Sequence, residues 1–324
     1  MNVLITGATG FIGRYLTIAL SKTYSVRCLV RKTSDIKGLT DLNVNLVYGD
    51  LLDKTSIAPA LDRIDLVYHL AGEVYSRKKD DFYKGNVLAT QNLLDACKEK
   101  RTGRIIFLSS VGVYKPVTTK TLLTEDSECG PITFYGKTKL DAESLIKKCN
   151  IPWVIVRAPV IYGPHQPAVV NRFFVDALIK KKIYIIGDGD NLRSLCFIQN
   201  LLEGLILLAE KPNATHKTYI LSDNLPYTFN EIMATASSVI KQKIEIVRLP
   251  NVLGAISWNI YKLMVSLFKL YFVELYSIRT MQINLGCDIS KAKTEIGYNP
   301  KVSLGAGIRR TEEWMKTDFS EYEE

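Results

Sequence analysis

The first thirteen residues constrain the fold more than any other stretch of this 324-residue chain. Residues 2–5 are a short apolar, partly β-branched run that predicts a buried strand. Three glycines follow, and apolar residues then recur at helical spacing over 11–19. This order predicts a strand, a glycine-rich turn and a helix. Such a turn can place the diphosphate of a dinucleotide on free amides at the helix N-terminus, where the helix dipole favours an anion.

Each glycine has its own task in this interpretation. Gly7 would allow the tight turn, Gly10 would let a diphosphate approach the backbone, and Gly13 would let helix and strand pack closely. The alternative is an ordinary glycine turn. The flanking strand and helix favour the dinucleotide site, whose predicted residues here are Gly7, Gly10, Phe11, Ile12 and Gly13.

The stretch TGATGFIG, residues 6–13, resembles the fingerprint of the short-chain dehydrogenase/reductases. More narrowly, it resembles their extended branch, the NAD(P)-dependent epimerase/dehydratase superfamily. Residues 157–164 resemble that family's RPxxVYGP motif, residues 186–200 its GDGxNxRxFxxVxD segment, and residues 287–300 its DxSKAxxxLGxxP close. The resemblance therefore spans nearly the whole chain.

The resemblance implies an α/β fold of the Rossmann type, a doubly wound parallel sheet with helices on both faces. Residues 1–160 would form the dinucleotide-binding domain, and residues 161–324 a smaller C-terminal α/β substrate-binding lobe, with some later segments packing back on the first domain. Apolar runs predict the remaining strands of the first domain at 26–30, 44–47, 65–70, 104–108 and 152–156.

The net charge of +9 and the pI near 9.1 could indicate a nucleic acid or an anionic membrane as partner. The basic residues are scattered, and we find no nucleic-acid-binding motif, so an anionic cofactor and substrate explain part of the excess. The six cysteines lie far apart and have no ligand spacing with the three histidines, so we predict no metal site. Free thiols and the lack of a targeting segment before the first strand lead us to expect a cytoplasmic protein.

Arg31 follows the second predicted strand, about 20 residues past the glycines, where an acidic residue would hold the ribose 2′-hydroxyl of NAD. A guanidinium there could grip a 2′-phosphate, so the sequence places NADP(H) slightly ahead of NAD(H). Asp35 lies close enough in the sequence that it could serve as that acidic residue, so NAD remains an alternative cofactor. A solvated surface position for Arg31 is the alternative.

Further cofactor contacts follow from the resemblance. Asp50 would accept a hydrogen bond from the adenine and Leu51 would pack on its ring, although Asp50 could instead cap the next helix. Small residues at the end of the fourth strand, in the stretch Leu70, Ala71 and Gly72, would let the dinucleotide cross the sheet. The same resemblance assigns Asn86, Ser109, Tyr135, Lys139, Pro159 and Val160 to the cofactor site, while Asn86 could also be a buried, hydrogen-bonded amide.

Tyr135 and Lys139 lie four residues apart at the start of a predicted helix, so they share one face. A tyrosine with a pKa near 10 is a poor base at pH 7, and we expect the neighbouring ammonium to lower that pKa. Tyr135 could then exchange a proton with a substrate oxygen during hydride transfer. In the resembled family Ser110 binds the same oxygen, and Lys139 holds the nicotinamide ribose. Val111 and the glycine after it stand where the family's dehydratases carry Asp-Glu, which argues against dehydration.

Arg193 matches the family's arginine that contacts a substrate diphosphate, a task suited to its planar guanidinium. A surface ion pair is the alternative. With Ser110, Val111 and Tyr135 it completes the predicted substrate-binding set. Val160 stands where many sugar epimerases have asparagine, which favours relatives that reduce ketones or oxidise alcohols.

Residues 251–278 are rich in apolar side chains but include Lys262, Lys269 and Glu274, so they lack the roughly 18 uncharged residues of a membrane span. The segment could pack over the substrate cleft or against a second subunit, which we favour. Alternatively, it could lie on a membrane as an interfacial helix. The resembled family usually forms homodimers through the helices that here carry Asn86 and Tyr135.

The combined prediction is an NAD(P)-dependent enzyme with a Ser-Tyr-Lys triad that acts on a nucleotide-linked sugar. Returning the hydride to the other face of the sugar gives an epimerase, whereas consuming NADPH gives a 4-keto-sugar reductase. One alternative is a ketoreductase or hydroxysteroid-type dehydrogenase acting on an apolar alcohol. The other is a relative that only binds the dinucleotide.

Overall fold

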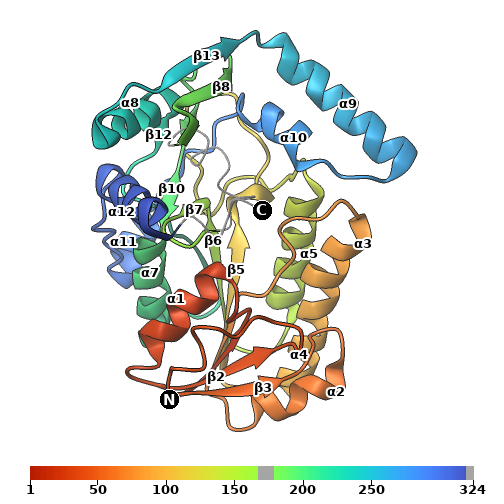
Figure 1. The fold of residues 1–324 in the computed structure, drawn as a ribbon. Coiled ribbons are helices and arrows are strands. Elements are labelled where there is room, and N and C mark those ends of the chain that lie inside the picture. The colour runs from red at the N-terminus through yellow and green to blue at the C-terminus, as the bar shows by residue number, and fades with distance from the viewer. Residues whose placement is uncertain (167–178, 319–324) are drawn as a thin grey trace.

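The computed structural model describes residues 1–166 and 179–318, and Figure 1 shows their arrangement. In these residues the main sheet has seven strands in the order β11-β6-β5-β4-β1-β2-β3, with every neighbouring pair parallel. The strands are β1 (Asn2–Thr6), β2 (Ser25–Val30), β3 (Val44–Tyr48), β4 (Leu66–His69), β5 (Arg104–Ser110), β6 (Trp153–Ala158) and β11 (Lys217–Ile220). The predicted doubly wound parallel sheet is confirmed.

The strand order places the ligand crevice. The chain builds outward from β1 to β3 and then restarts on the other side of β1 with β4. In open α/β sheets, ligands bind outside the carboxyl ends of the strands at such a switch point. The glycine-rich turn after β1 and the segment after β4 therefore meet at the expected binding edge.

The inner strands β1, β4, β5 and β6 are buried on both faces because their apolar side chains alternate between two cores, whereas the edge strand β3 is only partly covered. Val3 and Ile5 belong to one cluster and Leu4 to the other. In β5, Ile106 lies with the first cluster and Phe107 with the second. These near-continuous apolar runs are the reason that the strands could be predicted from the sequence.

Helices cover both faces of the sheet, with α1 and α7 on one side and α4 and α5 on the other (Figure 1). The helices, in chain order, are α1 (Phe11–Leu20), α2 (Lys54–Ile57), η1 (Ala58–Leu61), α3 (Lys79–Phe82), the π-helical η2 (Tyr83–Leu88), α4 (Ala89–Glu99), η3 (Val111–Val113), α5 (Phe134–Lys148), α7 (Ile198–Glu210), η4 (Pro212–Ala214), α8 (Phe229–Ile240), α9 (Val252–Phe268), α10 (Val273–Thr280), α11 (Ser290–Ile296) and α12 (Leu304–Asp318).

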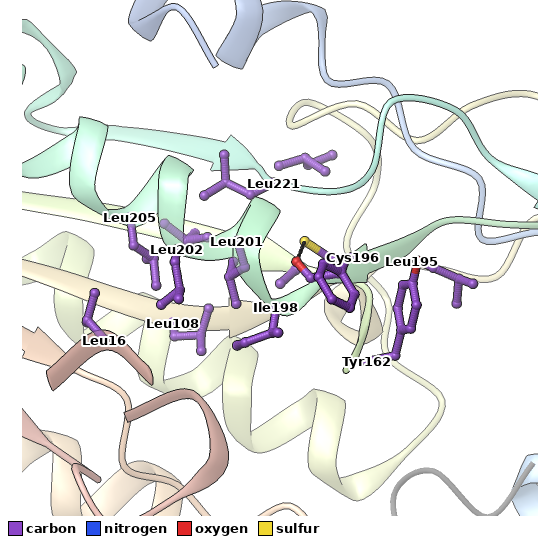
Figure 2. Packing of buried hydrophobic residues seen from close by; sticks show 14 of the residues in the cluster. Leu16, Leu108, Tyr162, Leu195, Cys196, Ile198, Leu201, Leu202, Leu205 and Leu221 are labelled. Atoms are coloured by element: carbon purple, nitrogen blue, oxygen red, sulfur yellow. Dashed lines mark hydrogen bonds between the residues drawn. The ribbon is translucent and has the colours of Figure 1, made fainter. Parts of the chain in front are cut away.

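Elements from beyond residue 160 return to the main sheet. Strand β11 pairs with β6 at the sheet edge, and α7 packs against α1 and β5. Figure 2 shows Leu201, Leu202 and Leu205 of α7 beside Leu16 of α1 and Leu108 of β5. The C-terminal half therefore supplies part of the first core, while a domain boundary at residue 160 stays a prediction.

Most of the remaining C-terminal half forms small two-stranded pairs and helices, and β8, β13, α9 and α10 lie together beyond one end of the sheet (Figure 1). Helix α11 instead packs against β11 of the main sheet. The short strands are β7 (Val160–Tyr162), β8 (Lys182–Ile186), β9 (Leu192–Arg193), β10 (Leu195–Phe197), β12 (Tyr227–Thr228) and β13 (Glu245–Leu249). Residues 251–278 make α9 and most of α10, which pack on each other. Across residues 1–166 and 179–318, no helix combines the length and apolar character that a membrane span requires.

Candidate active site

The glycine turn after β1 has a backbone that leaves little room for side chains. Gly7 has φ of +74°, and a Cβ there would lie 2.7 Å from the backbone nitrogen of Ala71. A Cβ on Gly13 would lie 2.0 Å from the carbonyl oxygen of Gly7. Helix α1 therefore starts directly against the turn, and the turn lies directly against the residues that follow β4.

The N-terminus of α1 has no side-chain cap. Its N-cap is Gly10, which has no side chain to bond the first-turn N–H groups. The amides of Phe11 and Ile12 belong to this turn, where N–H groups lack intrahelical partners. A helix N-terminus without a side-chain cap and beside a crowded glycine turn suits the diphosphate of a dinucleotide.

Arg31 comes directly after β2 and is exposed. The Asp35 carboxylate, which could have served NAD, accepts a hydrogen bond of 3.0 Å from Arg14 Nη2 and one of 2.9 Å from the Lys37 amide. These hydrogen bonds lower the pKa of Asp35. The groups at the end of β2 are thus mainly basic, with the nearby carboxylate already engaged.

Asp50 does not cap the helix that follows β3. Asp53 is the N-cap of α2, and its Oδ1 accepts from the Thr55 amide at 3.0 Å. Asp50 Oδ1 instead accepts from the Leu52 amide at 2.9 Å, in a local turn. Leu51 is half-buried against the second core. The capping alternative for Asp50 is therefore wrong, and within residues 1–166 and 179–318 its second carboxylate oxygen accepts no hydrogen bond.

The segment after β4 is fixed by Asn86, a buried residue in the π-helical turn η2. Its Oδ1 accepts from the Glu73 amide at 2.9 Å, and its Nδ2 donates to the Glu73 carbonyl and to Thr138 Oγ1. A Cβ on Gly72 would lie 2.7 Å from Asn86 Oδ1 and 3.3 Å from Lys139 Nζ. Asn86 is thus the buried, hydrogen-bonded amide, and it brings the end of β4 next to α5.

His69, at the end of β4, is fully buried between two threonines. Its Nδ1 lies 2.8 Å from Thr6 Oγ1 and its Nε2 lies 2.9 Å from Thr90 Oγ1. Burial, together with the nearby Lys139 ammonium, lowers the pKa of His69 to about 3. The imidazole is neutral at physiological pH and ties β1, β4 and α4 together.

Ser110, Tyr135 and Lys139 converge at the carboxyl end of β5. Ser110 is its last residue, and its Oγ accepts from the Gly112 amide at 3.0 Å. A Cβ on Gly112 would lie 3.3 Å from Ser110 Oγ and 4.0 Å from the Tyr135 ring, so the serine and tyrosine flank one backbone position. Helix α5 begins just before Tyr135, because Thr133 caps it by accepting from the Gly136 amide at 3.0 Å.

Burial dominates the protonation of both helical residues. It raises the pKa of Tyr135 to about 12, against the effect of a hydrogen bond with Ser110. It lowers the pKa of Lys139 to about 8, against the effect of the Glu143 carboxylate. Lys139 Nζ donates to the Leu108 carbonyl at 2.8 Å and lies 4.7 Å from the centre of the Phe107 ring. The sequence leads us to expect that Lys139 lowers the pKa of Tyr135, but among the groups of the protein itself burial dominates and raises that pKa instead.

A buried ion pair that the sequence interpretation missed lies one helical turn beyond Lys139. Glu143 accepts from Arg157 Nε at 3.0 Å and from Nη2 at 2.7 Å, and Ser109 Oγ donates to it at 2.6 Å. Both charged side chains are almost fully buried. The hydroxyl of Ser109 is therefore committed to Glu143. The available signal was the spacing, since Tyr135, Lys139 and Glu143 recur every four residues on one helix face.

The other predicted residues near Ser110 and Tyr135 differ in accessibility. Val111 is buried in η3, directly after Ser110, and Pro159 is buried between β6 and β7. Val160 begins β7 and is 45% exposed. Of these three side chains, only that of Val160 is broadly open to solvent.

Arg193 lies in β9, which pairs with β12 in the C-terminal half, outside the main sheet. Its guanidinium donates to the Thr280 carbonyl at the end of α10 and lies 5.1 Å from the centre of the Phe229 ring. Burial lowers its pKa to about 10. Its Nε has no hydrogen-bond partner in the part of the chain that the structure describes, and no carboxylate there pairs with it. Among the described residues, Arg193 therefore does not form the surface ion pair that was the alternative.

Aromatic rings connect Tyr135 with α9. Phe82 lies 6.5 Å from the Tyr135 ring centre and 6.2 Å from that of Tyr271. Tyr271 is in turn 6.4 Å from Tyr261, which stacks on Trp258 at 5.2 Å. We call these five rings the aromatic cluster. Its side chains make the surroundings of Tyr135 apolar on the side that faces α9.

A family model described as the NAD dependent epimerase/dehydratase family matches residues 3–222. The uncharacterised protein y4nL of Sinorhizobium fredii is 30% identical over 96% of this chain and 94% of its own length. The 4-hydroxy-2-methyl-3-oxo-4-farnesyl-3,4-dihydroquinoline-1-oxide ketoreductase of Stigmatella aurantiaca is 25% identical over 95% of each chain. The crystal structure of UDP-glucuronic acid 4-epimerase from Bacillus cereus in complex with NAD has a TM-score of 0.79 and 26% identity, and the match covers 100% of both chains.

The chain therefore belongs to the NAD dependent epimerase/dehydratase family. It is an NAD(P)-dependent enzyme of the extended short-chain dehydrogenase/reductase type. The resemblance drawn from the glycine turn and the later motifs is confirmed.

Proposed function

We propose that the enzyme transfers hydride between a nicotinamide cofactor and a carbon of a diphosphate-linked sugar, as a 4-epimerase or a 4-keto-sugar reductase. The observation that carries this proposal is the convergence of Ser110, Tyr135 and Lys139 at the carboxyl end of β5. The similarity to a UDP-sugar epimerase over the whole chain supports it.

The residues around the switch point suit a dinucleotide. A side chain at Gly7 or Gly13 would collide with the backbone of the glycine turn or of the residues after β4. The N-terminus of α1 has no side-chain cap. The end of β4 would lie along the middle of the cofactor, and Asp50 with Leu51 would hold the adenine. When bound, the nicotinamide supplies or accepts the hydride.

In this proposal Tyr135 moves the proton. Its raised pKa keeps the phenol protonated at neutral pH, so it can donate to the oxygen of a ketone that is being reduced. Ser110 would donate a hydrogen bond to the same oxygen. Lys139, buried beside the end of β4, would bind the cofactor ribose and stabilise a phenolate by its charge when the reaction runs toward oxidation.

For the cofactor we propose NADP(H) ahead of NAD(H), because Arg31 is exposed and Asp35 is engaged by Arg14. We expect the purified enzyme to bind NADPH about tenfold more tightly than NADH, since charge-assisted hydrogen bonds are worth roughly 1.5–3 kcal/mol. Isothermal titration with both cofactors measures this. Mass spectrometry of the nucleotide released on denaturation is the companion measurement. Near-stoichiometric NAD would contradict the preference and instead support an epimerase that regenerates its cofactor at each turnover.

For the substrate we propose that Arg193 binds the diphosphate. Its buried guanidinium has no carboxylate partner among the described residues, and an anion would compensate its charge. Arg193→Met should raise KM for a UDP-sugar by about ten- to a hundredfold, from the loss of a charged hydrogen bond. Arg248→Met is the matched control, because that exposed arginine of the C-terminal half bonds, among the described residues, Asn230 and the Asp188 carbonyl. An unchanged KM in folded Arg193→Met would remove the diphosphate assignment.

A second candidate is a ketoreductase for an apolar alcohol or ketone. The aromatic cluster beside Tyr135 favours it, as does the similarity to the Stigmatella aurantiaca ketoreductase. The Arg193 experiment separates the two. An apolar substrate without a diphosphate would be turned over equally well by the wild type and by Arg193→Met.

A further inference from the structure

Helix α9 has an exposed face made of large apolar side chains. Val252, Ile256, Ile260, Leu263, Leu267 and Phe268 are each between 45% and 64% exposed. The first five recur every three or four residues, so they form one stripe along the helix, and Phe268 ends it. We call these six residues the α9 outer face. Lone exposed apolar residues are ordinary, but a continuous stripe over the length of a helix indicates an interaction surface.

The opposite face of α9 is fixed to the protein. Gly254, Ser257 and Tyr261 are buried, and Ser257 Oγ donates to the Leu275 carbonyl at 2.6 Å. Tyr261 also belongs to the aromatic cluster. The helix is therefore held in one orientation. Turning the outer face inward would break the contacts of the inner face. Figure 1 shows α9 at the edge of the molecule, away from the main sheet.

The charges around the outer face are mainly positive. Helix α9 contains Lys262 and no carboxylate, and it ends at Lys269. The exposed residues Arg77, Lys78 and Lys79 lie beside its C-terminal end. The contacts there are a bridge between Lys78 and Leu270, a hydrogen bond of 3.0 Å from the Tyr271 amide to the Arg77 carbonyl, and the Arg77 guanidinium 5.0 Å from the Phe272 ring. Two carboxylates, Asp80 and Asp81, follow on α3, so the surroundings contain both signs of charge with an excess of cations.

We propose that the α9 outer face docks on an anionic membrane surface, with the helix lying in the plane of the interface. A helix of 17 residues with one apolar stripe, flanking cations and no carboxylate has the composition of an interfacial helix. Leucine, isoleucine and phenylalanine would enter the headgroup region, and the cations would bind lipid phosphates. A protein partner is less well matched, because nothing on the outer face offers it directional polar contacts.

Docking would also bring the membrane close to the candidate active site. The inner face of α9 holds Tyr261, and the aromatic cluster leads from there to Tyr135. Helix α9, about 10 Å across, would then lie between the lipid headgroups and the Tyr271, Phe82 and Tyr135 rings of that cluster. On the proposed function, this arrangement suits a substrate carried by a lipid. The docking itself does not depend on that function.

Sedimentation of the full chain with lipid vesicles tests the docking directly. We expect it to pellet with vesicles of phosphatidylcholine containing one third phosphatidylglycerol, and to bind vesicles of phosphatidylcholine alone at least tenfold more weakly. Added salt should release it, because each cation near an anionic surface contributes about 1 kcal/mol, or roughly fivefold in binding. Leu263→Glu/Leu267→Glu should weaken binding to the anionic vesicles at least about a hundredfold, since two buried leucines are lost and two charges are repelled.

Ile18→Glu/Leu225→Glu is the matched control. It adds the same two charges at exposed apolar positions elsewhere, and it should pellet like the wild type. Circular dichroism and thermal unfolding confirm that both double variants are folded. Failure of the wild type to pellet with anionic vesicles would overturn the proposal. So would a dimer in analytical ultracentrifugation that dissociates in Leu263→Glu/Leu267→Glu, because the outer face would then be an interface between two copies. Neither outcome touches the assignment of Tyr135, which turnover in solution tests separately.

Discussion

Replacing Tyr135 with phenylalanine should lower kcat about a thousandfold or more and leave the cofactor bound. A positioned acid or base typically contributes 10²–10⁴-fold to a rate, and Tyr135 is the proposed proton donor. The ring of phenylalanine keeps the packing on Phe82, at 6.5 Å, so the local fold is preserved. The measurement is steady-state turnover of a UDP-sugar or an apolar ketone with NADPH, together with the cofactor dissociation constant.

The cofactor constant should change by about tenfold at most, because only one neutral hydrogen bond is removed. Tyr83→Phe is the matched control, since this tyrosine of η2 is 51% exposed and has no assigned role. It should turn over like the wild type. If Tyr135→Phe kept full activity, the proposed mechanism would be wrong. A wild-type protein that bound the cofactor but turned over no substrate would instead support the alternative of a relative that only binds the dinucleotide.

The sheet and the glycine turn could be predicted because their signals are local. Strands buried on both faces read as unbroken apolar runs, and Gly7 and Gly13 stand where the backbone admits no side chain. Tyr135 and Lys139 could be paired from the sequence because four residues on a helix define one face. Each of these features depends on residues that are close in the chain.

The features that the sequence did not reveal depend on distant contacts. Burial at the carboxyl end of β5 raises the pKa of Tyr135, although the motif alone suggested the opposite direction. The partner of Glu143 is Arg157, which is brought alongside by the pairing of β5 with β6. For residues 251–278 the sequence left a packed segment and an exposed interfacial helix as alternatives, because an apolar helix can be either, and only the fold shows that the α9 outer face is exposed. Desolvation and burial follow from the assembled fold, not from spacing.

Replacing Glu143 with glutamine should destabilise the enzyme strongly. The change leaves the Arg157 guanidinium buried without its charge partner, and breaking such a buried pair costs about 3–5 kcal/mol. Urea unfolding followed by circular dichroism measures the loss. The matched control is Glu128→Gln, which breaks the exposed ion pair with Lys115 and should cost less than about 1 kcal/mol. Equal stability losses in the two variants would contradict a structural role for the buried pair.

The same substitution should also change the pH dependence of turnover. The Glu143 carboxylate raises the pKa of Lys139 against the effect of burial, which brings it to about 8. Removing that carboxylate should lower the pKa of Lys139 further, so the ammonium is lost at a lower pH. If the ammonium is the active form, kcat/KM should fall as pH rises through about 8 in the wild type, and at a distinctly lower pH in Glu143→Gln.

The direction of this shift separates positioning from mere stability. A variant that is only less stable would lose active enzyme at all pH values and keep the same alkaline limb. In Glu143→Asp the fall of kcat/KM at high pH should return part of the way toward its wild-type pH, because aspartate keeps the charge on a shorter side chain. Glu143→Gln has no charge and cannot do this. An unchanged alkaline limb in folded Glu143→Gln would show that Lys139 does not set the pH dependence. The buried carboxylate would then act on the fold alone.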